Sequence, residues 1–71
     1  MTNVGLLKEK IADSGITVTA VCHKSGILRE TLYNRFNGKG EFSASEITKL
    51  CNVLRLSKED REAIFFAQEV E

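Results

Sequence analysis

The segment from residue 17 to residue 39 constrains the fold of this chain more than any other part. It contains two short helical patterns that meet at Gly26, where a sharp turn needs the backbone freedom of glycine. Thr17 offers a side-chain oxygen that can cap the first helix, and Ile27 and Leu32 stand at the spacing of a hydrophobic staple around the start of the second. We therefore predict a helix-turn-helix at about residues 17–38, with helices over about residues 17–24 and 29–37.

Helix signals continue on both sides of this segment. Gly15 is placed to end a helix over about residues 3–14 in the left-handed conformation. Residues 43–46 read Ser-Ala-Ser-Glu, which is a capping box, and Ser57 with Asp60 repeats the same spacing at the start of a last helix. The chain contains no proline and no strand pattern. The sequence thus predicts an all-α fold, a compact five-helix domain that occupies residues 1–71.

Apolar side chains recur at helical spacing and indicate the core. On the first helix, residues 8–10 are charged and should face water. On the last helix, the adjacent Phe65 and Phe66 cannot both point the same way. The expected buried positions are Val4, Leu7 and Ile11; Val18, Val21 and Cys22; Leu32 and Phe36; Ile47, Leu50, Cys51 and Leu54; and Ala63, Phe66, Ala67 and Val70, with Leu6, Ile64 and Phe65 beside these stripes.

The charges are balanced overall but divided unevenly along the chain. The net charge is zero, yet residues 1–40 hold six Lys or Arg against three Asp or Glu, and residues 41–71 hold four against seven. The first part is therefore +3 and the second −3. Such an asymmetry favours binding of a polyanion by the more basic part of the molecule. An imbalance of this size also arises by chance.

Composition argues against several functional classes. Two Cys and one His are too few for a structural zinc site of four ligands. Cys22 and Cys51 sit among apolar residues, which favours reduced thiols that pack as small hydrophobes. We see no nucleophile–base pair and no glycine-rich phosphate loop, so we expect neither an enzyme nor a cofactor nor a small-molecule substrate. No apolar run approaches the length of a membrane span, and we expect a cytoplasmic protein.

The outer face of the helix over residues 29–37 suits major-groove recognition. Arg can bind guanine and Asn can bind adenine through two parallel hydrogen bonds, and Glu can accept one from cytosine. Tyr can reach a phosphate or pack on a thymine methyl group. The alternative interpretation, which assigns no function, is that these polar side chains form the solvated face of a surface helix. The candidate base-reading residues are Arg29, Glu30, Tyr33, Asn34 and Asn37.

Neighbouring residues are candidates for contacts to the DNA backbone. Thr17, Thr19 and Lys39 are expected there, with Arg35 at the flank. Amide groups at the starts of both helices also favour phosphate. Leu28 stands at the expected cap of the second helix without a capping oxygen, which costs about 1 kcal/mol. A local cost of this kind can accompany function, so we include Leu28 among the DNA-binding candidates.

The spacing of residues 18–39 resembles the helix-turn-helix of the lambda-repressor and Cro-like (XRE-type) regulators of phages and bacteria. A small residue, Cys22, precedes the turn glycine by four, apolar Ile27 and Leu32 follow it, and residues 37–39 resemble the common ending of the recognition helix. The resemblance implies a lambda-repressor-like fold and a helix that reads DNA. Two departures stand out: Val18 where the family often has Gln, and Leu28 where it often has Ser.

The leading hypothesis is a sequence-specific transcriptional regulator, repressor-like and of phage or prophage type, that binds double-stranded DNA. Family members usually bind as dimers on half-sites one helical turn apart, and Phe65 or Phe66 with Val70 could supply dimer surface. The alternative is a protein-binding module on the same fold, an antitoxin-like or phage accessory factor. Zero net charge, Leu28 and the acidic second half favour that alternative.

Overall fold

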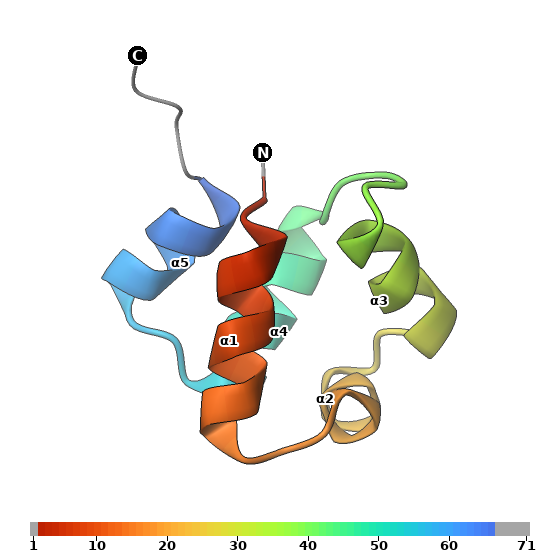
Figure 1. Ribbon diagram of the computed structural model, residues 1–71, viewed down its shortest axis with the longest axis horizontal. Helices are drawn as coiled ribbons and strands as arrows, with labels where there is room; N and C mark the ends of the chain where they lie inside the picture. The colour runs from red at the N-terminus through yellow and green to blue at the C-terminus, as the bar shows by residue number, and fades with distance from the viewer. Residues whose placement is uncertain (1, 67–71) are drawn as a thin grey trace.

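The computed structural model describes residues 2–66, which form five α-helices and no strand (Figure 1). The all-α prediction is confirmed. Each helix boundary that the sequence predicts lies within one residue of the observed one. The helices are α1 (Val4–Ser14), α2 (Val18–Ser25), α3 (Arg29–Phe36), α4 (Ala44–Leu54) and α5 (Lys58–Phe65).

Side-chain caps hold the starts of four of these helices. Asn3 caps α1 and Thr17 caps α2, and each accepts a hydrogen bond from the amide three residues later at 3.1 Å. Both predicted capping boxes are present, at the starts of α4 and α5. The exception is α3, because Leu28 precedes it and makes no capping bond. Only the recognition-helix candidate begins without a side-chain cap.

The core lies where α2 packs on α4 and α1 packs on α5 and α4. Its buried members come from every helix and from the connections after α2 and α3. Leu7, Val21, Leu32, Leu50 and Ile64 are fully buried. The remaining apolar core residues are Ile11, Cys22, Ile27, Phe42 and Phe65.

The predicted buried stripe of the last helix is wrong. Ile64 and Phe65 are buried, whereas Ala63 is exposed and Phe66 is 52% exposed. Phe65 packs edge-on against Phe42, with ring centroids 5.5 Å apart. This partner lies on the connection before α4, so tertiary packing rather than helical periodicity decides which phenylalanine is buried. Ala67 and Val70 lie outside the described residues.

Besides apolar packing, a backbone hydrogen bond and an ion pair join α5 to α1 and its cap residue. The backbone N–H of Asn3 donates to the carbonyl of Ile64 at 2.6 Å. The Lys10 ammonium lies 3.2 Å from the Asp60 carboxylate. Lys10 is therefore half-buried and paired instead of simply facing water, as the sequence pattern had indicated. The hydrogen bond from Lys10, followed by those from Ser57, lowers the pKa of Asp60.

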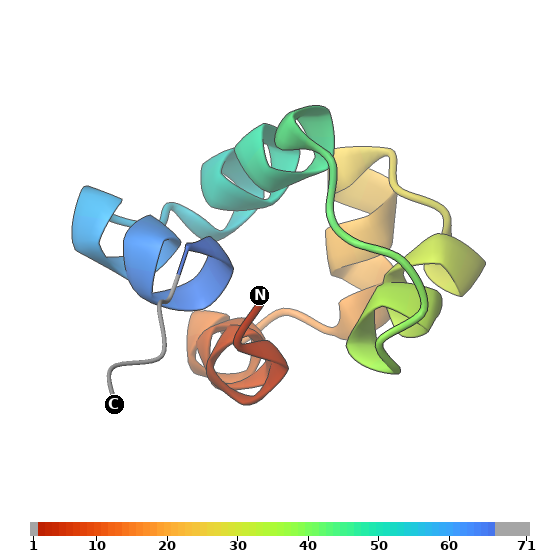
Figure 2. The same ribbon diagram turned by 90° about the horizontal axis from the view of Figure 1, so that it is seen from above.

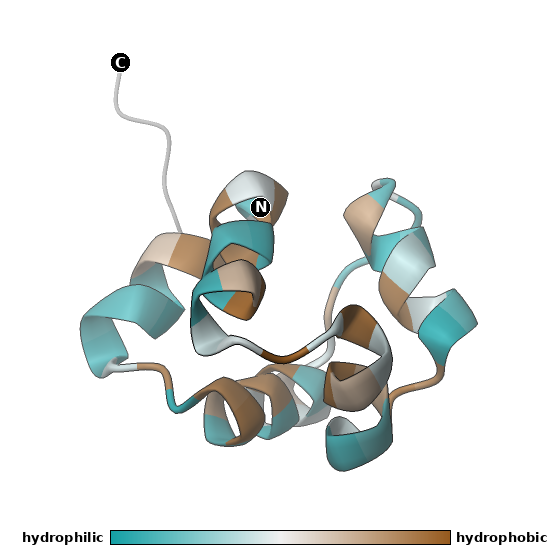
Figure 3. Ribbon diagram, turned by 60° about the horizontal axis from the view of Figure 1, so that its bottom comes forward, coloured by the Kyte–Doolittle hydropathy of each residue, from teal (hydrophilic) through white to brown (hydrophobic). Residues whose placement is uncertain are grey.

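The helices are arranged so that α3 and α5 lie at opposite ends of the molecule. α1 and α4 lie between them in both views (Figures 1 and 2). Figure 3 shows a hydrophobic connection running from α2 into α3, followed by a hydrophilic first turn of α3. This arrangement places α3 at one end of the molecule, while Ile27 of the connection before it is buried in the core.

Candidate nucleic-acid interface

The turn between α2 and α3 is closed by backbone and side-chain hydrogen bonds. Gly26 has φ of +75°, and its N–H donates to the carbonyl of Cys22 at 2.9 Å. A Cβ at this position would meet no atom within 4 Å, so the glycine is needed for its backbone conformation and not for space. Ile27, the next residue, is buried. The turn predicted from the sequence is confirmed.

Ser25 reinforces this turn, a role that the sequence analysis did not identify. Its side chain is buried, its hydroxyl lies 3.3 Å from the carbonyl of Cys22, and it accepts a hydrogen bond from the N–H of Ile27 at 3.2 Å. Because the hydroxyl satisfies backbone groups on both sides of Gly26, it fixes the entry of the chain into α3. A serine directly before a turn glycine is the only sequence signal of this role.

α3 is anchored on one side and open on the other. The sequence pattern predicted that Leu32 and Phe36 are buried. Leu32 is fully buried, whereas Phe36 is only half-buried. Arg29 and Glu30 are exposed in the first turn, and Leu28 before them is 73% exposed. The start of α3 thus presents three consecutive side chains to the surroundings, above an uncapped helix end.

The outer side of α3 also carries a ring contact. The Arg29 guanidinium carbon lies 5.5 Å from the centroid of the Tyr33 ring, within the range of a cation–π interaction. Tyr33 is 40% exposed and packs edge-on against Phe36 at 5.8 Å. The tyrosine therefore limits where Arg29 can point while leaving its charge accessible.

The last turn of α3 continues into a folded connection. Asn34 is half-buried, and its carbonyl accepts hydrogen bonds from the N–H groups of Asn37 at 3.2 Å and Lys39 at 2.8 Å. Asn37 and Lys39 themselves are exposed. Among the base-reading candidates on α3, Asn34 is the one that is not exposed, although the pattern placed it on the outer face. Asn37 and Lys39 lie on the connection after the helix ends.

The side chain of Arg35, the flank candidate, is occupied within the domain. It folds over Gly40, where a Cβ would lie 2.6 Å from the guanidinium, and it donates to the carbonyl of Lys39 at 3.0 Å. Its Nε atom lies 3.6 Å from the Glu46 carboxylate that also closes the capping box of α4. Arg35 therefore joins α3, the connection and α4.

The start of α2 carries two candidate phosphate-contacting residues, Thr17 and Thr19. Thr17 and Thr19 are both exposed. The Thr17 hydroxyl oxygen accepts the capping bond from Ala20, which leaves its hydrogen free to donate to a partner. Val18 is half-buried against the core. Its packing explains how an apolar residue is accommodated at this departure from the family pattern.

The two thiols belong to the scaffold of this surface. Both cysteines are free, and burial raises the pKa of each thiol, with Arg29 partly opposing the shift at Cys22. Neutral thiols pack as small apolar groups. Within residues 2–66 no three His, Cys, Asp or Glu side chains gather as a metal site would require. None of the described helices is long and apolar enough to span a membrane.

Comparison with known proteins gives one result at the level of the family. No curated protein and no solved structure matches the chain significantly. The sequence profile of the Cro/C1-type HTH DNA-binding domain matches residues 7–60, which include the whole turn, α2, α3 and α4. This match covers more than half of the 71 residues. The chain therefore belongs to the Cro/C1-type helix-turn-helix family of DNA-binding domains.

Proposed function

We propose that this domain is a sequence-specific transcriptional regulator that reads the major groove of double-stranded DNA with α3. The observation that carries the proposal is the start of α3, where Leu28, Arg29 and Glu30 are exposed above a helix end without a side-chain cap. The amide groups of a helix's first turn have no intrahelical acceptor. A nucleic acid can satisfy them through phosphate while the side chains contact bases.

Each side chain of this surface has a distinct role in the proposal. Arg29 binds guanine, and Asn37 with the less accessible Asn34 binds adenine. Glu30 accepts from a cytosine amino group or excludes other bases. Leu28 packs on a thymine methyl group, which accounts for an apolar residue that is 73% exposed.

The remaining candidates contact the DNA backbone and set the register of α3. Thr17 and Thr19 donate from the start of α2, and Lys39 donates from the connection after α3. Tyr33 contacts a phosphate or a thymine methyl group beside Arg29. Such contacts carry affinity and position the helix, but they do not encode sequence.

The regulator acts by occupying its site, as a repressor in the manner of the phage or prophage regulators that the sequence resembles. In this proposal it works in the cytoplasm, where bacterial DNA lies, and residues 1–71 are one domain without catalysis or cofactor. A reporter assay distinguishes repression from activation. A promoter that carries the bound sequence should lose expression when the protein is present, and increased expression would instead indicate an activator.

We propose that the domain binds DNA as a homodimer. A groove of about 280 Å³ opens between α4 and α5, bordered by Ile47, Arg61 and Phe66. Phe66 is 52% exposed, with the Arg61 guanidinium 5.7 Å from its ring centroid. Phe65 is buried, so Phe66 is the phenylalanine available for such an interface. Val70, the other candidate, lies outside the described residues.

Sedimentation tests the dimer with and without DNA. A protein that remains monomeric at high concentration and also on its selected site would refute this part of the proposal. Phe66→Ser should weaken self-association if the α4–α5 groove is the interface. The surface change His23→Ser, on α2 and outside this groove, should leave self-association unchanged.

The main experiment is a selection of bound sequences from a random pool of double-stranded DNA. An enriched palindrome would support sequence-specific binding and dimeric symmetry together. Binding should also weaken steeply with salt, since each neutralised phosphate adds about −0.9 to the slope of log affinity against log salt.

The second candidate function is a protein-binding module on the same fold, antitoxin-like or a phage accessory factor. The exposed apolar Leu28 and Phe66, together with a net charge of zero, favour this alternative. Binding through apolar surface should depend weakly on salt. Failure to shift any DNA at low salt, together with salt-insensitive binding to a protein partner, would select this function over the first.

A further inference from the structure

Four side chains form a continuous row of cations and rings from α3 to α1. Arg29 lies 5.5 Å from the Tyr33 centroid, Tyr33 packs on Phe36 at 5.8 Å, and the Lys8 ammonium lies 5.2 Å from the centroid of Phe36. Arg29 and Lys8 are the ends of this row. Lys8 belongs to α1 and is thus far from the helix-turn-helix in sequence, but it contacts the last residue of α3.

Lys8 lies on an aromatic ring, unlike the two cations of the domain that form ion pairs with carboxylates. Lys10 is paired with Asp60, and Arg35 is paired with Glu46. Among the described residues, Lys8 has no carboxylate within ion-pair distance, and its side chain is exposed. A ring attracts a cation without neutralising it. Lys8 is therefore held in place with its full positive charge available to an anion.

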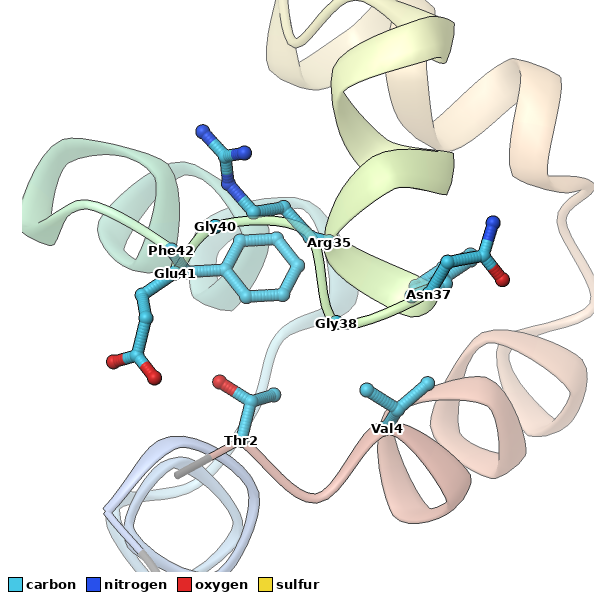
Figure 4. A pocket seen from close by; sticks show the side chains of 9 residues that line it. Thr2, Val4, Arg35, Asn37, Gly38, Gly40, Glu41 and Phe42 are labelled. Carbon is cyan, nitrogen blue, oxygen red and sulfur yellow. The ribbon is translucent and has the colours of Figure 1, made fainter.

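The surroundings of Phe36 place this charge beside the recognition-helix candidate. A groove of about 330 Å³ opens between the first turn of α1 and the end of α3, lined by Val4, Phe36, Asn37 and Gly38 among others (Figure 4). Val4 precedes Lys8 by one helical turn, so the two residues lie on the same face of α1, and Lys8 contacts Phe36, which lines the groove. Asn37, a candidate base-reading residue, borders the same groove.

We propose that Lys8 is a phosphate-contacting residue of the DNA interface and that Phe36 is the residue that positions it. The proposal rests on the proposed function of α3. Arg29 lies at the amino end of α3 and Lys8 at its carboxyl end. With α3 in the major groove, Lys8 contacts the DNA backbone that borders the groove at the carboxyl end of the helix. Phe36 makes no base contact and acts through Lys8.

The first test measures the salt dependence of binding for Lys8→Gln. Loss of one phosphate contact should reduce the magnitude of the log–log salt slope by about 0.9, and so reduce affinity about eightfold at 0.1 M salt, taking the curves to meet at 1 M. Lys58→Gln is the matched control, because Lys58 is an exposed lysine at the start of α5, at the opposite end of the molecule. It should change neither the slope nor the affinity.

The second test asks whether Phe36 positions Lys8. In a Phe36→Leu background, Lys8→Gln should cost clearly less than eightfold, because the ammonium is no longer held on a ring. In a Phe36→Tyr background, which keeps the ring, the full cost should return. If Phe36→Leu does not fold by circular dichroism, Phe36→Met supplies the ring-free background.

The outcomes separate this inference from the proposed function. Wild-type binding to a selected site with an unchanged slope in Lys8→Gln would overturn the phosphate contact and leave α3 as the reader. An eightfold loss that is the same with Leu and Tyr at position 36 would overturn the positioning role. Absence of any wild-type DNA binding would overturn the proposed function and this inference with it.

Discussion

The α3 end and the α5 end of this domain use similar parts in different ways. Each carries an exposed large apolar residue, Leu28 or Phe66, and an arginine over an aromatic ring at 5.5 or 5.7 Å. The α5 end begins with a complete capping box, and its Asp60 is ion-paired with α1. The α3 end begins without a cap.

This difference indicates which of the two helix starts is available to an anionic ligand. At the start of α5, the protein itself satisfies the helix amides and the aspartate charge. At the start of α3, the amides and the Arg29 charge have no such partner among the described residues. Unsatisfied donors beside a free cation favour an anionic ligand. The start of α5 is thus satisfied within the domain, whereas the start of α3 is the helix start that an anionic ligand can complete, as the proposed DNA contact requires.

The largest expected effect tests whether the two ends share one core. Leu32 in α3 and Ile64 in α5 are both fully buried. Leu32→Ala and Ile64→Ala should each reduce the free energy of unfolding by roughly 2–5 kcal/mol. Thermal unfolding should show a fall in Tm of at least about 10 °C for both. A small shift in Leu32→Ala alone would show that α3 is not held by the common core.

The next effect separates binding from stability. Arg29→Ala should weaken specific DNA binding by about 1–3 kcal/mol, the cost of one good bidentate base contact. Stability should change by less than about 0.5 kcal/mol, because the side chain is exposed. Titration of the selected DNA and thermal melts measure the two quantities. Lys58→Ala removes one charge at the α5 end and should leave binding unchanged, and equal losses in both variants would point to a nonspecific charge effect.

Exchange of cap residues compares the two helix starts directly. Ser57→Ala removes a cap and should destabilise the domain by about 1 kcal/mol without affecting DNA binding. Leu28→Ser introduces a capping oxygen and should stabilise the domain by about 0.5–1 kcal/mol while weakening or altering site selection. Urea unfolding and DNA titration report the outcomes. An unaltered site preference in Leu28→Ser would remove Leu28 from the interface.

The smallest effect concerns pH at the α5 end. The folded-state pKa of Asp60 is lowered, mainly by Lys10, so ionised Asp60 contributes stability above the unfolded pKa of about 4. That contribution is lost as the pH falls through the lowered pKa. The Tm of wild type should exceed that of Asp60→Asn at pH 6, and the difference should narrow below about pH 4. A difference independent of pH would show that the ion pair contributes nothing.

The sequence predicted the elements of the fold well because its signals for them are local. Capping boxes and turn glycines involve residues within one helical turn, so their roles at Ser43, Ser57 and Gly26 could be inferred without tertiary information. The exposed positions of Arg29 and Glu30 followed from the same helical geometry, and the uncapped position of Leu28 followed from the predicted start of the helix.

The remaining features depend on contacts between distant parts of the chain. The choice of Phe65 over Phe66 depends on Phe42, and the pairing of Lys10 depends on Asp60. Helical periodicity treats Lys8 and Lys10 alike, yet one lies on the Phe36 ring and the other in an ion pair. The sequence could therefore name DNA-contact candidates on α3, whereas the proposed role of Lys8 on α1 could be inferred only from its contact with Phe36.

The hydrogen bond from Asn3 to Ile64 has a topological consequence. It joins the residue before α1 to the last turn of α5, so the first and last helices are bonded to each other. Fraying at the start of α1 and fraying at the end of α5 break the same bond, which couples these two helix ends in partial unfolding. A linker across this bond would permit circular permutation, with new termini opened in a connection remote from α3, such as the one between α4 and α5.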